Sequence, residues 1–137
     1  PVIFEANQTA DGRRKAIYHT NVMMCIAETF VVICLDSIDD KKEQKNVVKH
    51  LKKDGKEIIE ILEEQVNNFA GNMLQVSGKD DEKFLVMSQA AYDALNAAQV
   101  RKIEGHCRII SISLEVIEYC GGGSARCMMT EVFLPPA

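Results

Sequence analysis

The sequence predicts an α/β fold in which one strand–strand–helix–strand unit occurs twice, over residues 17–62 and 73–114. Two observations favour this fold. Short β-branched and aromatic runs alternate with longer segments whose apolar residues recur at helical spacing, and the order and lengths of these runs match between the two units. Such a unit covers its own sheet poorly, so its repetition suggests a propeller or an array. Because two units close a ring poorly, we expect an arc of a larger architecture.

The first unit follows a polar lead-in, residues 1–16, with a turn at Ala10, Asp11 and Gly12. Its central run, TFVVICL, carries no charge and predicts a strand buried on both faces. Asp39 and Asp40 can cap the helix that follows, and Gly55 suits its C-terminal end. The expected elements are strands over 17–26 and 29–35, a helix ending near residue 53, and a strand over 56–62.

The second unit is preceded by a short helix that we expect from Glu63 to Ala70, ending at Gly71. Ser88 is a good N-cap for the long helix of this unit. The expected elements are strands over 73–77 and 83–88, joined by a turn at 79–82, a helix over 89–103, and a strand over 108–114. A last apolar strand is expected over 128–134, MMTEVFL.

Length and composition suit one soluble globular domain over residues 1–137. The chain has 137 residues, a net charge of −4, 47% hydrophobic residues and 26% charged residues. It contains no uninterrupted apolar run of the ~18–20 residues that a membrane helix needs. No basic patch is interleaved with aromatic residues, and Trp is absent, so we expect no nucleic-acid partner and no membrane partner. The chain opens on Pro1 without Met or a signal region, which predicts either processing or excision from a longer chain.

The five cysteines indicate a reducing compartment, and we expect a cytoplasmic protein. Their odd number and the absence of C-x-x-C spacing argue against a disulfide framework and a zinc site. Cys25, Cys34 and Cys107 lie in or beside apolar runs, where a thiol behaves as a small hydrophobic group. The acidic residues form no metal-binding pattern, so no metal or cofactor is expected.

The stretch EYCGGGSARCMM is the most specific one for chemistry. The three glycines, Gly121 to Gly123, let the backbone adopt positive φ and approach another group closely. Cys127 follows this loop directly after Arg126, and nearby positive charge and free N–H groups both favour a thiolate. The alternative is a flexible hairpin with an incidental buried thiol, because glycine runs are common in turns.

Of the three histidines, His19 is the best candidate for acid/base chemistry. His50 lies in a lysine-rich helix and is expected to be solvated, and His106 has no obvious partner in the sequence. A cysteine with a histidine distant in sequence is the minimum for nucleophilic catalysis, although a strand histidine often only satisfies an interior hydrogen bond. In the run FAGNML, Asn72 is expected to have a structural role, orienting a loop or capping a chain reversal.

Four motifs, YHTNVMMCI, FAGNMLQV, LVMSQAAYDAL and GGGSARCMMTEVFLP, resemble the C-terminal half of the amidinotransferase-like enzymes that modify guanidino groups. This superfamily includes arginine deiminases, dimethylarginine hydrolases and agmatine deiminases, and the citrulline-utilisation hydrolases resemble the chain most. The resemblance runs over nearly all of residues 16–135. It implies a partial α/β propeller of the pentein type, built of the repeated units, with the chain as its C-terminal portion.

The resemblance also implies a covalent mechanism. Cys127 matches the family nucleophile, and His19 matches the general acid/base. The expected activity is that of an amidinohydrolase or deiminase of arginine metabolism, acting on the guanidino or ureido group of an arginine- or citrulline-like small molecule. Asn21, Arg126, Gly122 and Gly123 are expected to contact the substrate.

Three alternatives stay open at this point. An amidinotransferase would use the same Cys/His pair with an amine in place of water as the acceptor. A chain that is naturally this short could instead be a non-catalytic binding module, and self-association into a homo-oligomer is compatible with either reading. Deiminases usually carry an aspartate where this chain has Asn21, so a less cationic, ureido-type substrate gains weight.

Overall fold

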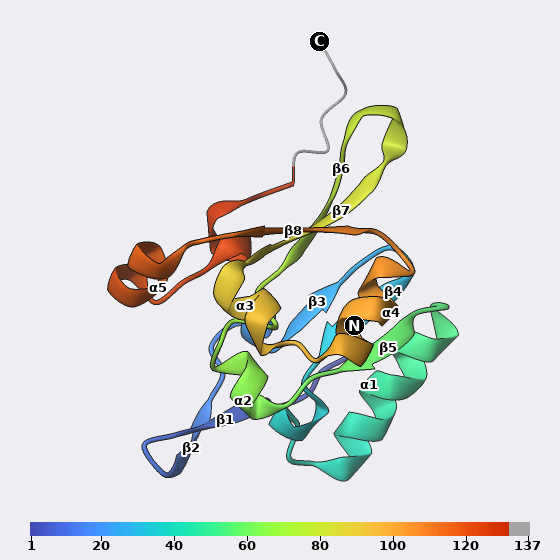
Figure 1. Cartoon of the computed structure of the whole chain (residues 1–137). Helices are drawn as coiled ribbons and strands as arrows, with labels where there is room; N and C mark the ends of the chain where they lie inside the picture. The colour runs from blue at the N-terminus through green and yellow to red at the C-terminus, as the bar shows by residue number, and fades with distance from the viewer. Residues whose placement is uncertain (132–137) are drawn as a thin grey trace.

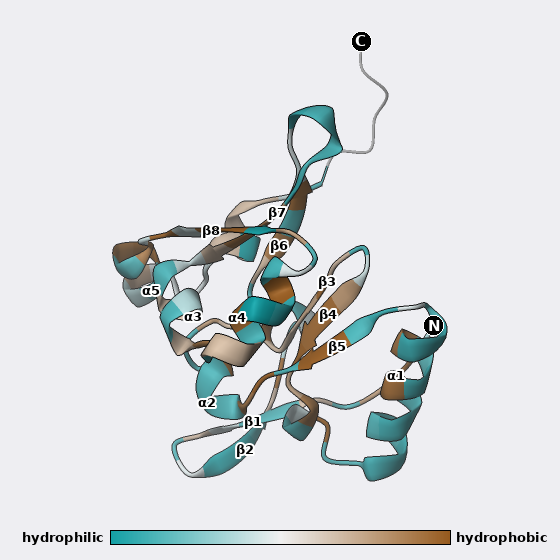
Figure 2. Cartoon of the chain, turned by 45° about the vertical axis from the view of Figure 1, so that its right-hand side comes forward, coloured by the Kyte–Doolittle hydropathy of each residue, from teal (hydrophilic) through white to brown (hydrophobic). Residues whose placement is uncertain are grey.

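The computed structural model describes residues 1–131 and has a mixed α/β fold with two three-stranded sheets. In each sheet the first two strands are antiparallel, and the third lies parallel to the second after a helical crossover. The predicted strand–strand–helix–strand order is therefore confirmed twice. Figures 1 and 2 show the sheet of the second unit above that of the first, with β1 and β2 at the bottom. The first unit consists of β3 (Met24–Ile26), β4 (Phe30–Ile33), α1 (Lys41–Lys53) and β5 (Glu57–Glu60).

The second unit contains two crossover helices where the sequence predicts one. Leu95 adopts an extended conformation with ψ of 140°, and the side chain of Asn96 accepts hydrogen bonds from the Ala98 and Gln99 N–H groups at 2.9 and 3.0 Å. The predicted helix over 89–103 was therefore wrong as a single element, because an asparagine cap competes with continuation of the helix. The unit consists of β6 (Leu74–Ser77), β7 (Lys83–Ser88), α3 (Gln89–Ala94), α4 (Ala97–Glu104) and β8 (Arg108–Ile112).

Three other predicted elements differ in extent. The strand predicted over 17–26 is confined to β3, because residues 20–22 form a 3-10 helix, η1 (Thr20–Val22). The helix predicted over 63–70 is confined to α2 (Glu63–Val66), and Phe69 then takes a positive φ of 64°. Of the strand predicted over 128–134, residue 128 ends a 3-10 helix, residues 129–131 are irregular, and the remainder lies outside the described residues.

The core follows the apolar runs. All four residues of β4 are fully buried, which confirms the prediction of a strand covered on both faces, and Leu85 and Met87 of β7 are equally buried. Figure 2 shows the central strands as hydrophobic, whereas much of α1 is hydrophilic. Asp40 caps α1 by accepting hydrogen bonds from the N–H groups of Lys42 and Glu43, as its position in the sequence predicts.

Polar contacts join the second unit to the first unit and to α2. Gln65 and Gln99 exchange amide hydrogen bonds of 2.7 and 3.0 Å, although both side chains are buried. The ring of His106 lies 2.9 Å from the Thr29 hydroxyl and 3.0 Å from the Glu57 carboxylate. These partners lie 34 to 77 residues apart in the chain, so no local pattern indicates them.

In the part of the chain that the structure describes, no helix has the length and apolar content needed to cross a bilayer.

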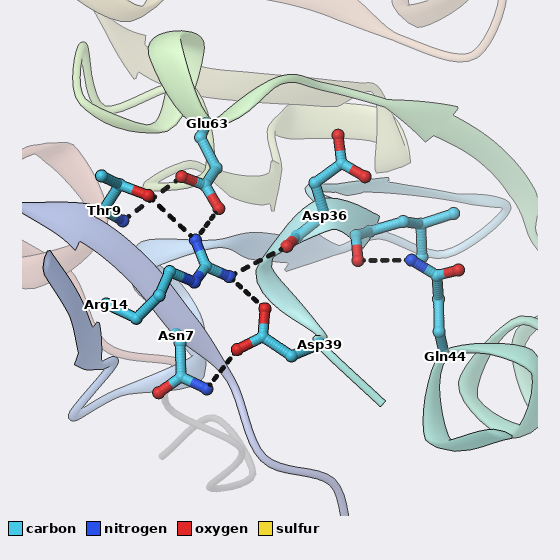
Figure 3. Close-up of polar contacts among 8 residues, drawn as sticks. Asn7, Thr9, Arg14, Asp36, Asp39, Gln44 and Glu63 are labelled. Carbon is cyan, nitrogen blue, oxygen red and sulfur yellow. Dashed lines mark hydrogen bonds and ion pairs between the residues drawn. The ribbon is translucent and has the colours of Figure 1, made fainter. Parts of the chain in front are cut away.

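Residues 1–16 contain a β-hairpin that the sequence predicts only at its turn. Strands β1 (Asn7–Ala10) and β2 (Arg13–Ala16) flank Asp11 and Gly12, which both take positive φ. The hairpin is attached to the first unit through Arg14 (Figure 3). Its guanidinium pairs with the Glu63 carboxylate, lies 2.5 Å from Asp39 Oδ1, and donates to the Asp36 carbonyl at 3.1 Å.

Gly71 occupies a position where no side chain fits. A Cβ built there would lie 2.3 Å from the carbonyl oxygen of Val22 and 2.8 Å from the carbonyl carbon of Met23. Both contacts are with backbone atoms, which cannot rotate aside. The chain after α2 therefore packs directly on the backbone that joins η1 to β3.

We expect Gly71→Ala to lower the free energy of unfolding by about 1–3 kcal/mol or more, because the added methyl group forces the two backbones apart. Gly121→Ala is the control, since a Cβ at that position meets no atom within 4 Å. Urea denaturation of both variants measures the difference. Equal midpoints for Gly71→Ala and the unmodified protein would contradict the close approach.

The Arg14 contacts predict a pH dependence of stability. The hydrogen bond from Arg14 lowers the pKa of Asp39. Burial alone would raise the pKa of Glu63, but hydrogen bonds from Arg14 and Thr9 outweigh this effect and the pKa is lowered. The stabilisation is therefore complete above the ordinary values of 3.8 and 4.5, and it is lost as the pH falls through the lower folded values.

In Arg14→Met, we expect the free energy of unfolding to fall less steeply than in the unmodified protein between about pH 5 and about pH 3. Arg13→Met is the control, because it removes the same charge from β2 at a position without an ion pair in the described residues. Urea titrations at several pH values provide the measurement. Parallel pH profiles for the two variants would show that Arg14 has no special role.

Candidate active site

Cys127 lies in a 3-10 helix, η4 (Ala125–Met128), directly after α5 (Glu115–Gly121) and the glycine loop. Gly122 takes a φ of 65° and ends α5, so the expectation of positive φ in this loop is confirmed at that residue. A Cβ at Gly123 would lie 3.2 Å from the Cys127 Cβ and 3.3 Å from its Sγ. The absence of a side chain at Gly123 therefore makes room for the thiol.

The base of the loop is held by a buried serine. The Ser124 hydroxyl donates a hydrogen bond of 2.6 Å to Oε1 of Glu118 on α5, and the Ser124 carbonyl accepts one of 3.0 Å from the Cys127 N–H. Ser124 is fully buried, whereas Cys127 is exposed. The flexible hairpin with a buried thiol, the alternative considered for this stretch, therefore does not describe the structure.

Asn72 connects Cys127 to the segment that follows His19. Its Nδ2 lies 3.3 Å from the Cys127 Sγ and donates to the Asn21 carbonyl at 3.2 Å, while its Oδ1 accepts from the Arg126 N–H at 3.0 Å. Asn72 is only 4% exposed. The sequence predicts that Asn72 orients a loop or caps a chain reversal, whereas its side chain bridges distant segments and contacts the thiol, which was not predicted.

A cavity of about 190 Å³ opens beside Cys127. Its walls come from the hairpin, from the segment around η1, and from the end of α2 with the residues that follow it. The glycine loop and Cys127 complete it. Its lining residues are Gln8, Tyr18, Val22, Val66, Asn67, Phe69, Asn72, Gly122, Gly123 and Cys127.

His19 stands at the edge of this arrangement. It is exposed and has extended backbone angles immediately before η1, and its carbonyl accepts from the Val22 N–H at 3.0 Å. Its ring lies edge-on to the Tyr18 ring, with 6.3 Å between centroids. Tyr18 and Val22 both line the cavity. His19 lies between them in the sequence but is not itself a lining residue.

Asn21 and Arg126 line a second, larger cavity of about 490 Å³, together with residues of β3 and α1. The Arg126 guanidinium donates to the Met129 carbonyl at 2.8 Å and pairs with the Glu131 carboxylate at 3.1 Å. The backbone groups of both residues, rather than their side chains, are the ones that meet Asn72. The structure thus places Gly122, Gly123 and Cys127 together at one cavity, whereas Asn21 and Arg126 line the other.

Burial separates the other cysteines from Cys127. Burial raises the pKa of the Cys25 thiol to about 12 and also raises the pKa values of Cys34 and Cys107. The expectation that these three behave as small hydrophobic groups agrees with their burial. Cys120 on α5 is exposed, like Cys127.

Neither of the remaining histidines lines the cavity beside Cys127, although His50 lines the larger one. His50 is exposed on α1, as expected, and its Nδ1 lies 2.8 Å from the Asn46 carbonyl. His106 lies at the junction of the two units and stacks on Phe30 with 4.8 Å between ring centroids. Within residues 1–131, no three His, Cys, Asp or Glu side chains come close enough together to hold a metal ion.

Sequence reasoning missed several lining residues. Gln8 reaches the cavity from the hairpin, and Tyr18 and Phe69 contribute aromatic walls. Tyr18 and Phe69 lie inside the motifs YHTNVMM and FAGNML, so those motifs were a usable signal. For Gln8 no sequence signal exists, because its position depends on how the hairpin is attached.

Comparisons with known proteins point to one superfamily. Residues 1–134 match the family described as N,N dimethylarginine dimethylhydrolase, eukaryotic. No curated protein matches the chain.

Solved structures share its fold at 17–18% sequence identity. Apo ArgZ, an arginine dihydrolase from the ornithine–ammonia cycle in cyanobacteria, gives a TM-score of 0.61 at 18% identity over 86% of this chain and 17% of that one. The N-terminal domain of ArgZ bound to product gives 0.58 at 18% identity, over 81% of this chain and 36% of that one. A cysteine-to-alanine mutant of AgrE with L-arginine gives 0.58 at 17% identity, over 81% of this chain and 15% of that one.

The chain therefore spans at most 36% of the length of these three structures, and at such identities they show the fold alone. The predicted resemblance to guanidino-group-modifying enzymes is confirmed at the level of the superfamily. By the match over residues 1–134, the chain belongs to the N,N dimethylarginine dimethylhydrolase family.

Proposed function

We propose that this chain carries the nucleophile and the acid/base residue of a hydrolase that acts on the guanidino or ureido group of an arginine- or citrulline-like small molecule. One observation carries the proposal: an exposed cysteine faces a cavity, and its thiol contacts the same asparagine that binds the segment following His19. The family match, the arginine dihydrolase activity of ArgZ and the complex of an AgrE mutant with L-arginine support the substrate class.

The proposed reaction has two halves. The Cys127 thiolate attacks the guanidino carbon, so that a C–S bond forms and a tetrahedral adduct results. Cleavage of a C–N bond then releases an amine, whose nitrogen takes a proton from His19, and the substrate carbon stays bound to sulfur. Water attacks this carbon after giving a proton to His19, and the C–S bond breaks to return the thiolate.

The cavity suits the reacting head group of such a substrate. Its volume of about 190 Å³ is below the ~300–1,000 Å³ of typical ligand pockets, which fits a planar guanidino or ureido group better than a whole amino acid. Gly122 and Gly123 are the proposed backbone contacts of the substrate. In this proposal Asn21 and Arg126 act through their backbone groups, because these groups contact Asn72 and both residues line the larger cavity.

We propose that the two units form neighbouring parts of a pentein-type α/β propeller and that the chain is the C-terminal portion of that domain. Two features support this: the unit repeats with the same strand order, and the solved relatives are several times longer than the chain. The remaining walls of the substrate site would then come from other units of the propeller.

Cys127 is expected to be the first of the five cysteines to react with iodoacetamide near neutral pH. Cys25, Cys34 and Cys107 are buried, and Cys120, although exposed, makes no contact with Asn72. Peptide mass spectrometry after short labelling pulses gives the order. Uniform labelling, or faster labelling at Cys120, would argue against a special role for Cys127.

In the full-length enzyme, Cys127→Ser is expected to abolish turnover, because a hydroxyl supplies almost no anion at neutral pH. His19→Ala should also stop turnover but allow a covalent adduct to accumulate, since water then lacks its base. The double variant should lose little more than either single one, because groups that act as a unit are non-additive. Release of ammonia from arginine, citrulline and agmatine, and of ornithine from arginine and citrulline, provides the assay.

Cys120→Ser is the matched control, as it removes the other exposed thiol near the same loop and should leave turnover unchanged. Losses that simply multiply in the double variant would show independent roles for Cys127 and His19. Unchanged turnover in Cys127→Ser would refute the proposed mechanism.

A further inference from the structure

We propose that Asn72 is a positioning residue for the reaction. Its amide fixes the position of the Cys127 thiol relative to the segment that follows His19, and it stabilises the thiolate by donating a hydrogen bond to sulfur. This inference rests on the proposed function. It concerns a residue that the sequence predicts only as a structural one.

The hydrogen-bond partners of Asn72 carry the inference. A side-chain amide has two N–H donors and one carbonyl acceptor, and a buried one must satisfy them inside the protein. Asn72 directs its amide to the Asn21 carbonyl, the Arg126 N–H and the Cys127 Sγ, which lie 51, 54 and 55 residues away in the chain. All three belong to the two segments that bear His19 and Cys127. An asparagine with a purely local capping role would bind its own loop instead.

The backbone around Asn72 is held in place by its contacts with neighbouring backbone segments. Gly71 lies directly against the backbone of Val22 and Met23, and the Asn72 N–H donates to the Phe69 carbonyl at 2.8 Å. The side-chain amide therefore has little freedom to follow a displaced thiol. Asn72 therefore fixes the position of η1, through the Asn21 carbonyl, and the position of η4, through the Arg126 N–H.

Both polar atoms of the Asn72 amide lie within hydrogen-bond distance of sulfur. Nδ2 lies 3.3 Å from Sγ and can donate to it, and the thiol can donate to Oδ1 at 3.7 Å. A hydrogen bond donated to an anion stabilises the charged form of the group. Within residues 1–131, the Arg126 guanidinium is paired with Glu131 and does not contact the thiol, so the Asn72 amide is the donor at sulfur.

The test measures alkylation of Cys127 by iodoacetamide as a function of pH in the full-length protein. Asn72→Asp keeps the shape of the side chain, replaces the donor by an oxygen and adds a negative charge. We expect the alkylation rate at pH 7 to fall roughly ten- to hundred-fold, as for loss of a hydrogen bond to a charged group. We also expect the pH of half-maximal rate to move upward. A merely structural role would not move the pH profile.

Asn68→Asp is the matched control, because Asn68 is exposed, does not line the cavity beside Cys127, and donates its side-chain amide to the Glu64 carbonyl at 3.0 Å. It adds the same charge without removing a donor from sulfur, and it should leave the profile close to that of the unmodified protein. Equal shifts in Asn68→Asp and Asn72→Asp would show a general charge effect and overturn the proposal.

If the buried charge prevents Asn72→Asp from folding, Asn72→Ala removes the amide without adding charge. Slower alkylation and an upward shift are expected here too, while Cys25, Cys34 and Cys107 stay protected from labelling. An unchanged Cys127 profile in Asn72→Ala would overturn the proposal. The proposed function is tested separately, because turnover that survives in Cys127→Ser would refute it whatever the alkylation profile shows.

Discussion

The approach of two backbones at Gly71 is the constraint on which the site depends. The chain after α2 comes so close to Val22 and Met23 that no Cβ fits between them. This contact places Asn72, the next residue, where its side-chain amide contacts both the Asn21 carbonyl and the Arg126 N–H of η4. A tight backbone contact and a polar bridge thus follow one another in sequence, and together they relate the His19 segment to Cys127.

Local patterns predicted the parts of the fold that local physics determines. The apolar run around β4 and the Asp40 cap of α1 were read correctly, because burial on both faces and capping leave signatures within a few residues. The repeated unit followed from the order of such elements. The strand expected over 17–26 was wrong at residues 20–22, where the structure has η1. The Asn21 carbonyl of this 3-10 helix accepts a hydrogen bond from Asn72, a partner 51 residues away that leaves no local signature.

The candidate site was predictable only in part. Cys127 was identified from its glycine loop and from the family resemblance, and the structure explains the loop: Gly122 ends α5 with positive φ and Gly123 leaves room for the thiol. The expectation that Arg126 supports the thiol through its charge could not take account of Glu131, which pairs with the guanidinium. The sequence predicted only a structural role for Asn72, because its three side-chain partners lie more than 50 residues away and leave no local pattern.

The same residue type has two different chemical environments within one small chain, and burial makes the difference. Cys25 lies in a strand where removal from water raises its pKa to about 12, so that its thiol remains neutral and serves packing. Cys127 lies on a helical turn beyond a glycine loop, where the sulfur faces a cavity and meets an amide donor instead of apolar side chains. Cys120 is also exposed, but among residues 1–131 no amide donates a hydrogen bond to its thiol. Reactivity in this chain should therefore depend on the pairing of access with the Asn72 amide, and neither feature alone is sufficient.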